Sequence, residues 1–314
     1  MATSGSFDWE ENRTNIIKNA LQLIGAVGLG ESVGTDANTQ AVLILNAVLK
    51  HMQTLGMPLW ATEFAYIFPV SNTNQVSLGS SGGHASLAYV HTYTDTAAAS
   101  AATTISVDSI TGISASDNIG IEQSDGTFQW TTVSGAPSGT TITLAAALTA
   151  AVAVDAHVYT YTTKLVRPLK IHDGWRRFFE DTVDTPLTKI SRTEYMDLGT
   201  KESEGTPTQF YYDPQTTSGE FNFWPRFSDG DYLLVVSYHR EVADMDADAN
   251  TFDFPNEWLL PITWRLAWAL SPFYGVDPME RRQLLTEAQS LLKDVADWDQ
   301  EDTSIKFQPK PKYG

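Results

Sequence analysis

The sequence predicts an α+β protein: a helical bundle, formed by an N-terminal helical hairpin plus C-terminal helices, with an antiparallel β-sheet and an inserted small all-β barrel or sandwich module. Three observations predict this fold class. Apolar residues recur at three-and-four spacing near both ends of the 314-residue chain, as in amphipathic helices. Between these ends, alternating apolar and polar residues indicate strands. Within the strand region, residues 84–163 contain no Lys or Arg, and this change of composition marks a separate module.

The first helical segment begins at Asp8 or Asn12 and ends at Gly25, because glycine commonly terminates helices. A second runs from about Asp36 to the Gly-Met-Pro of residues 56–58, and the two predict a helical hairpin. Residues 25–31 between them contain three glycines. Since a helix rather than a strand precedes these glycines, we expect no dinucleotide-binding loop.

Strands are expected next at residues 64–68 and 76–78, followed by a Gly/Ser linker at 79–83. In the insert, short β-branched segments are divided by Gly-containing and Pro-containing turns. They predict five strands, at residues 104–107, 118–122, 127–133, 140–144 and 157–161. Short strands at this spacing are typical of a small barrel or sandwich.

The first domain resumes at residue 165, with a short helix expected through Trp175 and Phe178. Ser191 and Glu194 have capping-box spacing. Strands at 209–212, 220–225 and 232–238 then predict an antiparallel meander. The predicted domains are a host domain (1–83 and 164–304), an inserted β domain (84–163) and an extended arm (305–314).

Residues 253–270 predict a central helix that is apolar on nearly every face. Asp253 is the expected N-cap, and Pro261 is expected to cause a kink because it lacks a backbone donor. The core of this helix is assigned to Trp258, Trp264 and Trp268. A last amphipathic helix is predicted over residues 278–298.

The net charge of −18 argues against a protein that grips DNA phosphates, but not against one that DNA slides past. Five cationic residues fall within 164–177, where a local basic patch is expected. An acidic wall, as a channel for DNA would require, is expected from the acids at the end of the last helix: Asp294, Asp297, Asp299, Glu301 and Asp302.

No residue is assigned to catalysis, to a cofactor or to a metal. The chain has no Cys, which excludes disulfides, thiolate metal sites and a cysteine nucleophile. No serine lies on a nucleophile-elbow pattern. The acidic residues 244–250 lack the glycine and glutamate that a calcium loop needs. With 38 acids, carboxylate pairs such as Glu202 and Glu204 arise by chance. No signal peptide or membrane segment is expected, so folding in the cytoplasm is predicted.

Several motifs resemble tailed-bacteriophage head-to-tail adaptor proteins, also called connectors or tail accessory factors. They lie in the predicted host domain: NIIKNALQLIGA (15–26), LNAVLKHM (45–52), GMPLW (56–60), RPLKI (167–171), DTPL (184–187), GTPTQFYYDP (205–214) and FPNEW (254–258). The insert at 84–163 also resembles a small β module that some of these proteins contain.

The resemblance implies a ring-shaped homo-oligomer, commonly dodecameric, below the portal protein at the head–tail junction of the virion. The ring would extend the DNA channel for genome ejection and dock the next tail tube, nozzle or fibre protein. Double-stranded DNA would pass without specific binding, and no membrane contact is implied. The protein would be made in the host bacterial cytoplasm.

The last residues are expected to form an extended arm, because two Pro-Lys units forbid a helix. We expect this arm to contact the portal or a neighbouring subunit through Phe307, Gln308, Pro309, Lys310, Pro311, Lys312 and Tyr313. The insert is expected to face outward and contact neighbouring tail parts.

Two alternatives from other classes remain open at this stage. One is another tail structural or receptor-binding protein, which would be a trimer rather than a large ring. The other is a tail-associated glycan hydrolase, which would need two carboxyl groups about 5 to 9.5 Å apart in a cleft.

Overall fold

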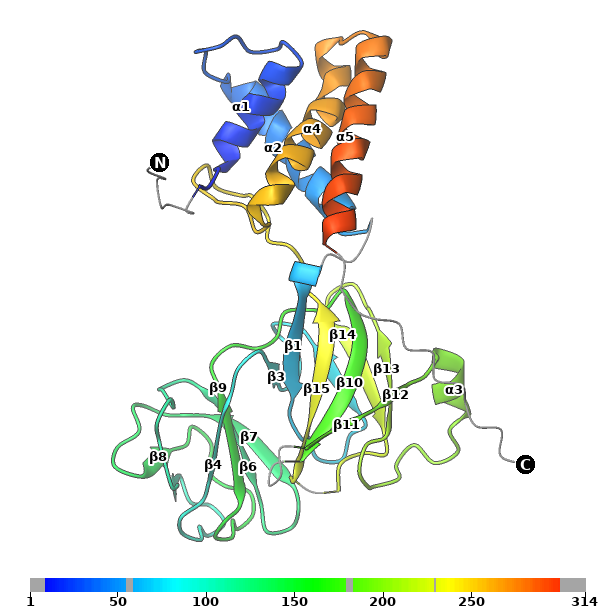
Figure 1. Ribbon diagram of the computed structural model, residues 1–314. Helices are drawn as coiled ribbons and strands as arrows, with labels where there is room; N and C mark the ends of the chain where they lie inside the picture. The colour runs from blue at the N-terminus through cyan, green and yellow to red at the C-terminus, as the bar shows by residue number, and fades with distance from the viewer. Residues whose placement is uncertain (1–8, 55–58, 179–182, 229, 300–314) are drawn as a thin grey trace, which may run out of the picture. The chain divides into compact units, whose positions relative to one another are not determined.

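The computed structural model describes residues 9–54, 59–178, 183–228 and 230–299 (Figure 1). In these residues the fold is mixed α+β, with five α-helices and four sheets. The chain divides into two compact units: a helical unit of residues 1–61 and 242–314, and a β unit of residues 62–241. This division groups the insert with the host strands. The predicted domain boundaries stay a prediction.

The described residues of the helical unit form four α-helices, among them the predicted N-terminal hairpin and final helix. Asn12 caps the first helix by accepting a hydrogen bond from the Asn15 amide (2.9 Å), and Gly25 follows the last turn with φ +70°, as expected. The elements are α1 (Arg13–Leu23), α2 (Thr35–Met52), α4 (Leu259–Leu270), α5 (Pro278–Trp298) and the short 3-10 turns η1 (Leu59–Ala61), η2 (Asn256–Trp258) and η3 (Ser271–Tyr274).

Helix α4 is the central element of this unit, as predicted. It packs against α1, α2 and α5 (Figure 1). Its fully buried side chains include Ile262, Leu266 and Leu270, which share one apolar core with Ile17 and Leu45. Burying such side chains is the main favourable term in holding the helices together.

The predicted start of the central helix was wrong, and the kink at Pro261 stays a prediction. The 3-10 turn η2 precedes α4, and Asp253 instead accepts a hydrogen bond from the Ala243 amide (3.1 Å). Pro261 is the third residue of α4. Because the first-turn N–H groups have no partner within a helix, the missing donor requires no kink there.

The acidic turn at residues 244–250 anchors both helices of the hairpin. Arg13, which is buried, donates to the Met245 carbonyl (3.0 Å) and pairs with Asp248. The Met245 amide donates to the side-chain oxygen of Asn46 (2.9 Å). Here the carboxylates serve a structural role.

The β unit contains two sheets that share one core, together with the inserted module. Its elements are β1 (Thr62–Ile67), β2 (Gln75–Leu78), β3 (Ala85–Ser86), β4 (Val90–Tyr93), β5 (Thr104–Ser106), β6 (Asn118–Glu122), β7 (Phe128–Thr132), β8 (Thr141–Thr143), β9 (His157–Tyr161), β10 (Lys170–Phe178), β11 (Val183–Pro186), β12 (Thr188–Lys189), α3 (Arg192–Asp197), β13 (Gln209–Asp213), β14 (Gly219–Trp224) and β15 (Tyr232–His239).

The host sheets have the orders β11-β10-β15-β1-β3 and β12-β13-β14-β2. Their strand pairs are antiparallel except β12–β13. The facing side chains, such as Phe210, Phe221 and Leu234, are fully buried in a common core. The predicted three-strand meander is therefore wrong, because β15 leaves β14 to pair with β10 and β1.

Residues 175–178 form part of β10, where a short helix was expected. Trp175 and Phe178 are three residues apart, which imitates helical spacing. The segment is instead held by strand partners on both sides, since Trp175 lies opposite Val235 of β15 and Pro186 of β11. Tertiary pairing overrides the local pattern.

The five predicted strands of the insert correspond to β5–β9, but the prediction missed β4, and the described residues form no closed barrel. A four-stranded sheet, β4-β9-β6-β7, and a two-stranded sheet, β5-β8, share a core that includes Ile119, Val158 and Ile142. The Gly/Ser segment 79–83 is not a free linker: the Gly83 amide donates to the Ser77 carbonyl (2.6 Å), and Lys164 donates to the Gly82 carbonyl (2.6 Å).

Candidate functional site

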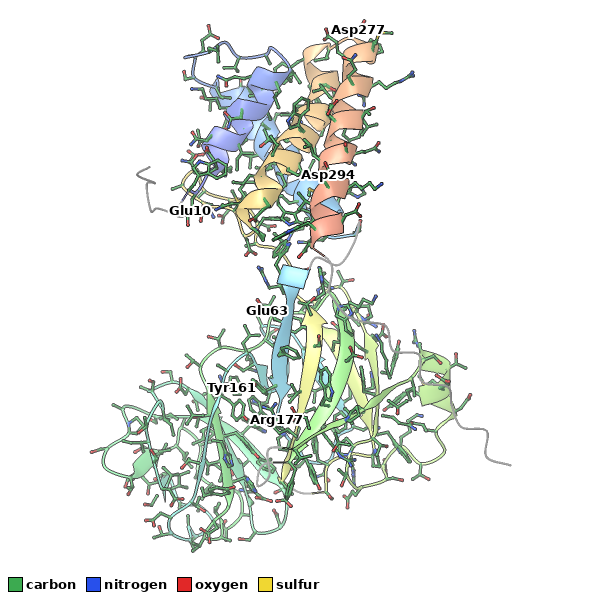
Figure 2. The ribbon with its side chains drawn as sticks, in the orientation of Figure 1. Glu10, Glu63, Tyr161, Arg177, Asp277 and Asp294 are labelled. Atoms are coloured by element: carbon green, nitrogen blue, oxygen red, sulfur yellow. The ribbon has the colours of Figure 1, made fainter. Side chains whose placement is uncertain are left out.

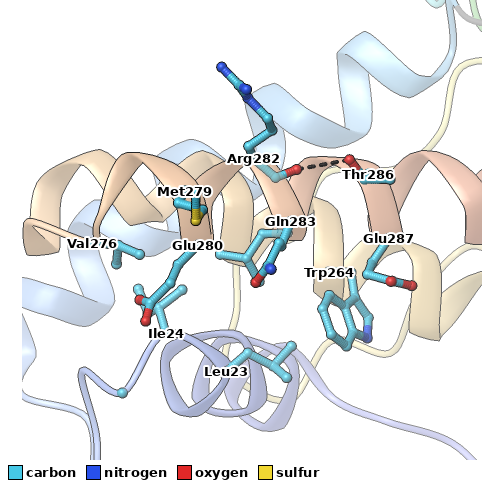
Figure 3. Close-up of a pocket in the computed structure, with 12 residues that line it drawn as sticks. Leu23, Ile24, Trp264, Val276, Met279, Glu280, Arg282, Gln283, Thr286 and Glu287 are labelled. Carbon is cyan, nitrogen blue, oxygen red and sulfur yellow. Dashed lines mark hydrogen bonds between the residues drawn. The ribbon is translucent and has the colours of Figure 1, made fainter.

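Two adjoining hollows on the helical unit form an extended concave surface. One has a volume of about 800 Å³ and is bounded by the end of α1 and the start of α5; the other, about 470 Å³, lies between α1 and the start of α4. Leu23 and Trp264 line both (Figure 3). We call the pair the α1–α4–α5 groove.

The groove exists because α1 and α5 flank α4 without closing over it. Over its 21 residues, α5 buries only Leu284 and Ala288, so most of its apolar residues are only partly covered. Large apolar side chains are left exposed around the groove: Leu23 (41 %), Leu260 (54 %), Trp9 (59 %) and Met279 (74 %). A contiguous exposed apolar surface of this kind is typical of a protein-binding site.

Acidic side chains surround the apolar floor. Glu280 and Glu287 of α5 line one hollow, and Glu11 lines the other. Arg282 is the only cationic residue among the described lining residues, and Figure 3 shows its side chain pointing away from Leu23 and α1. One carboxylate oxygen of Glu11 is buried and has no hydrogen-bond partner in the described part of the chain. The groove thus fits a ligand that is both apolar and cationic.

The three predicted core tryptophans lie in different environments. Trp258 is buried and packs edge-on against Trp60 at 6.3 Å between ring centroids. Trp264 is half-buried in the groove, and Trp268 is half-buried beneath the guanidinium groups of Arg265 (4.5 Å from the ring centroid) and Arg281 (5.8 Å). Of the three tryptophans assigned to the core, only Trp258 is therefore buried.

The predicted acidic face is only partly within the described residues. Asp294 and Asp297 are exposed on the last turns of α5, and Asp299 is the C-cap of that helix. Figure 2 shows Asp294 well along α5 from Asp277, its N-cap. Because residues three apart are neighbours on a helix, Asp294 and Asp297 form one acidic surface.

Other predicted site residues lie outside the described part of the chain. These are Glu301 and Asp302 of the acidic face, and the arm residues Phe307, Gln308, Pro309, Lys310, Pro311, Lys312 and Tyr313.

Two of the five cations in the basic patch predicted at 164–177 are paired with acids. Arg167 pairs with Glu241, and Arg177 pairs with Asp184 through two hydrogen bonds of 2.7 and 2.8 Å. This bidentate pair holds the pKa of the Asp184 carboxyl below its usual value. Cations engaged in this way offer little to a DNA phosphate.

A buried polar network joins the insert to the host sheets. His157 contacts His91 (3.0 Å between ring nitrogens) and Asp231 (3.4 Å), while the Tyr159 hydroxyl donates to the Gly230 carbonyl (2.8 Å). Tyr159 is fully buried, and burial raises its pKa. An acid beside an imidazole also occurs in catalytic relays, but the enclosure of these rings favours a structural role.

Comparisons with known proteins assign no family. No protein-family model matches the sequence, and a search of curated proteins finds no match either. In the described residues, no helix is long and apolar enough to span a bilayer, and no group of three or more potential metal-ligating His or acidic side chains is present.

Proposed function

We propose that the chain is a structural head-to-tail adaptor of a tailed bacteriophage. In this proposal it forms a ring below the portal protein in the virion, extends the DNA channel and docks downstream tail components, without catalysing a reaction. The single observation that supports it best is the α1–α4–α5 groove. A subunit of a cyclic ring needs a surface for its neighbour that differs from the surface it presents itself.

The charge distribution supports the same proposal. A channel for DNA must not bind the phosphate backbone, and a protein with a net charge of −18 repels it. Asp294 and Asp297, exposed on α5, are our candidates for the channel wall, together with Asp299, Glu301 and Asp302.

The groove's role is tested by the substitution Leu23→Glu. Leu23 lies at the centre of the groove and is 41 % exposed, so a carboxylate there should leave the fold intact. In a subunit contact, however, the carboxylate would replace the apolar surface that the neighbour covers, and burying a charge against apolar groups is strongly unfavourable. We expect Leu23→Glu to abolish ring formation in sedimentation velocity experiments, with and without the portal protein of the same phage.

The matched control is Leu29→Glu, since Leu29 is 94 % exposed and does not line the groove. It should assemble like the unmodified chain. Normal assembly of Leu23→Glu, or equal loss in both variants, would remove the groove from the proposal.

A further inference from the structure

The groove selects for one kind of occupant. Its floor is apolar, with Leu23, Leu260 and Trp264 accessible, and its lining carries three carboxylates, Glu11, Glu280 and Glu287. Glu11 is half-buried at the edge of its hollow, and Glu280 and Glu287 are exposed on α5. The occupant should therefore combine ammonium or guanidinium groups with large apolar side chains.

The C-terminal segment of this same chain has that composition. Residues 306–313 contain Lys306, Lys310 and Lys312 together with Phe307 and Tyr313, and they include no acid. In a chain with 20 Lys and Arg against 38 acids, three lysines within seven residues are a marked local excess. The segment is thus complementary to the groove in both charge and apolar character.

The spacing of the charges agrees as well. Glu280 and Glu287 are seven residues apart on α5, which places them about 10.5 Å apart along the helix axis. Prolines at 309 and 311 favour an extended segment, in which Lys306 and Lys310 would be about 12 Å apart. One extended segment could therefore bring an ammonium group to both Glu280 and Glu287.

We propose that residues 306–313 of a neighbouring copy dock in the α1–α4–α5 groove, with the lysines facing Glu11, Glu280 and Glu287 and an aromatic side chain against Leu23 and Trp264. The inference rests on the proposed function, because a head-to-tail contact between copies is what closes a ring. A segment held extended by proline also loses little conformational entropy on binding.

The absence of Cys from the chain permits a clean cross-linking test. One full-length variant carries Leu23→Cys and a second, with a tag of different size, carries Tyr313→Cys. The two are mixed, alone and with the portal protein of the same phage, and treated with a short bis-maleimide. A product of mixed size can form only between separate chains. The control replaces Leu23→Cys by Leu29→Cys, which places the thiol on an exposed residue outside the groove.

We expect the mixed product with Leu23→Cys in at least severalfold greater yield than with Leu29→Cys. Glu280→Gln combined with Glu287→Gln should lower that yield severalfold, and added salt should lower it in the unmodified groove, because exposed ion pairs are screened. Circular dichroism and unfolding curves check that each variant is folded.

Three other outcomes would each contradict the docking inference. If the chain forms rings by mass but the groove gives no more product than the control, the docking inference is wrong and the adaptor function stands. If a chain carrying both cysteines cross-links only to itself, the occupant is the chain's own segment, and the inference is again wrong. If no ring forms under any condition, the proposed function fails as well.

Discussion

His84 lies at the contact between the insert and the host strands. Its ring stacks on Trp130 (3.9 Å between centroids), and its Nδ1 atom forms a hydrogen bond with the Tyr161 hydroxyl (2.8 Å). Burial, together with the positive charge of Lys164, lowers the pKa of His84 from 6.5 to about 4. The folded protein therefore holds this imidazole neutral at neutral pH.

This shift predicts that the β unit loses stability in acid. Between pH 6.5 and about 4 the unfolded chain binds a proton at His84 that the folded chain does not, so unfolding becomes more favourable as pH falls. The stability should be complete above pH 6.5 and lost progressively towards pH 4. Urea unfolding followed by tryptophan fluorescence would measure it.

The substitution His84→Gln tests how much of the acid-dependent loss of stability comes from His84, because glutamine keeps a hydrogen-bonding side chain but does not titrate. We expect a shallower loss of stability in this variant, whereas His51→Gln, at an exposed position on α2, should behave like the unmodified chain. Identical pH profiles for all three proteins would contradict the assignment.

The burial of single side chains was the property that the sequence predicted least well. Trp258, Trp264 and Trp268 are equally apolar in sequence, yet only Trp258 is buried. Periodicity shows that a helix needs partners but not how far each neighbour covers it. For the same reason Leu23 and Leu260 could not be distinguished from core residues. A surplus of apolar residues on α1 and α5 is the only sequence signal that could have indicated a groove.

At the scale of elements, α4 has one side in the core and another in the groove. Leu266 is fully buried and Leu260 is 54 % exposed. We expect Leu266→Ala to lower the free energy of unfolding by about 2–5 kcal/mol through the cavity it creates. Leu260→Ala should change it by less than about 0.5 kcal/mol but weaken ring formation. Urea unfolding measures the stability of both variants, and sedimentation velocity measures ring formation. Equal losses of unfolding free energy in Leu266→Ala and Leu260→Ala would contradict the assignment of one side of α4 to the core and the other to the groove.

Helix α5 carries the candidate channel surface. The substitutions Asp294→Lys and Asp297→Lys reverse the charge of this surface at two exposed positions. If this face lines the channel, assembled particles of the variant should retain DNA at low salt and eject it more slowly, and the effect should vanish at high salt. The control changes Glu257→Lys, an exposed acid before α4. Unaltered ejection in the α5 variant would place the channel wall elsewhere.

Elements with a strong local signal were predicted well, and those fixed by distant partners were not. The strands β6 and β9 have the predicted bounds, because turns delimit them on both sides. The path of β15 could not be predicted, since its partners β10 and β1 lie far from it in sequence. The start of α4 was missed because Asp253 accepts a hydrogen bond from the Ala243 amide instead of capping the helix.

For the whole molecule, the central claim is that copies of this chain close into a ring at the head–tail junction. Its two supports are the acidic-rimmed apolar groove, a property of the described helical unit, and the excess negative charge, a property of the composition.

The most direct test is the mass and symmetry of the purified protein, alone and mixed with the portal protein of the same phage, by light scattering and negative-stain microscopy. We predict a closed ring with rotational symmetry, formed by the protein alone or on the portal. A monomer or a trimer that the portal leaves unchanged would contradict the adaptor function.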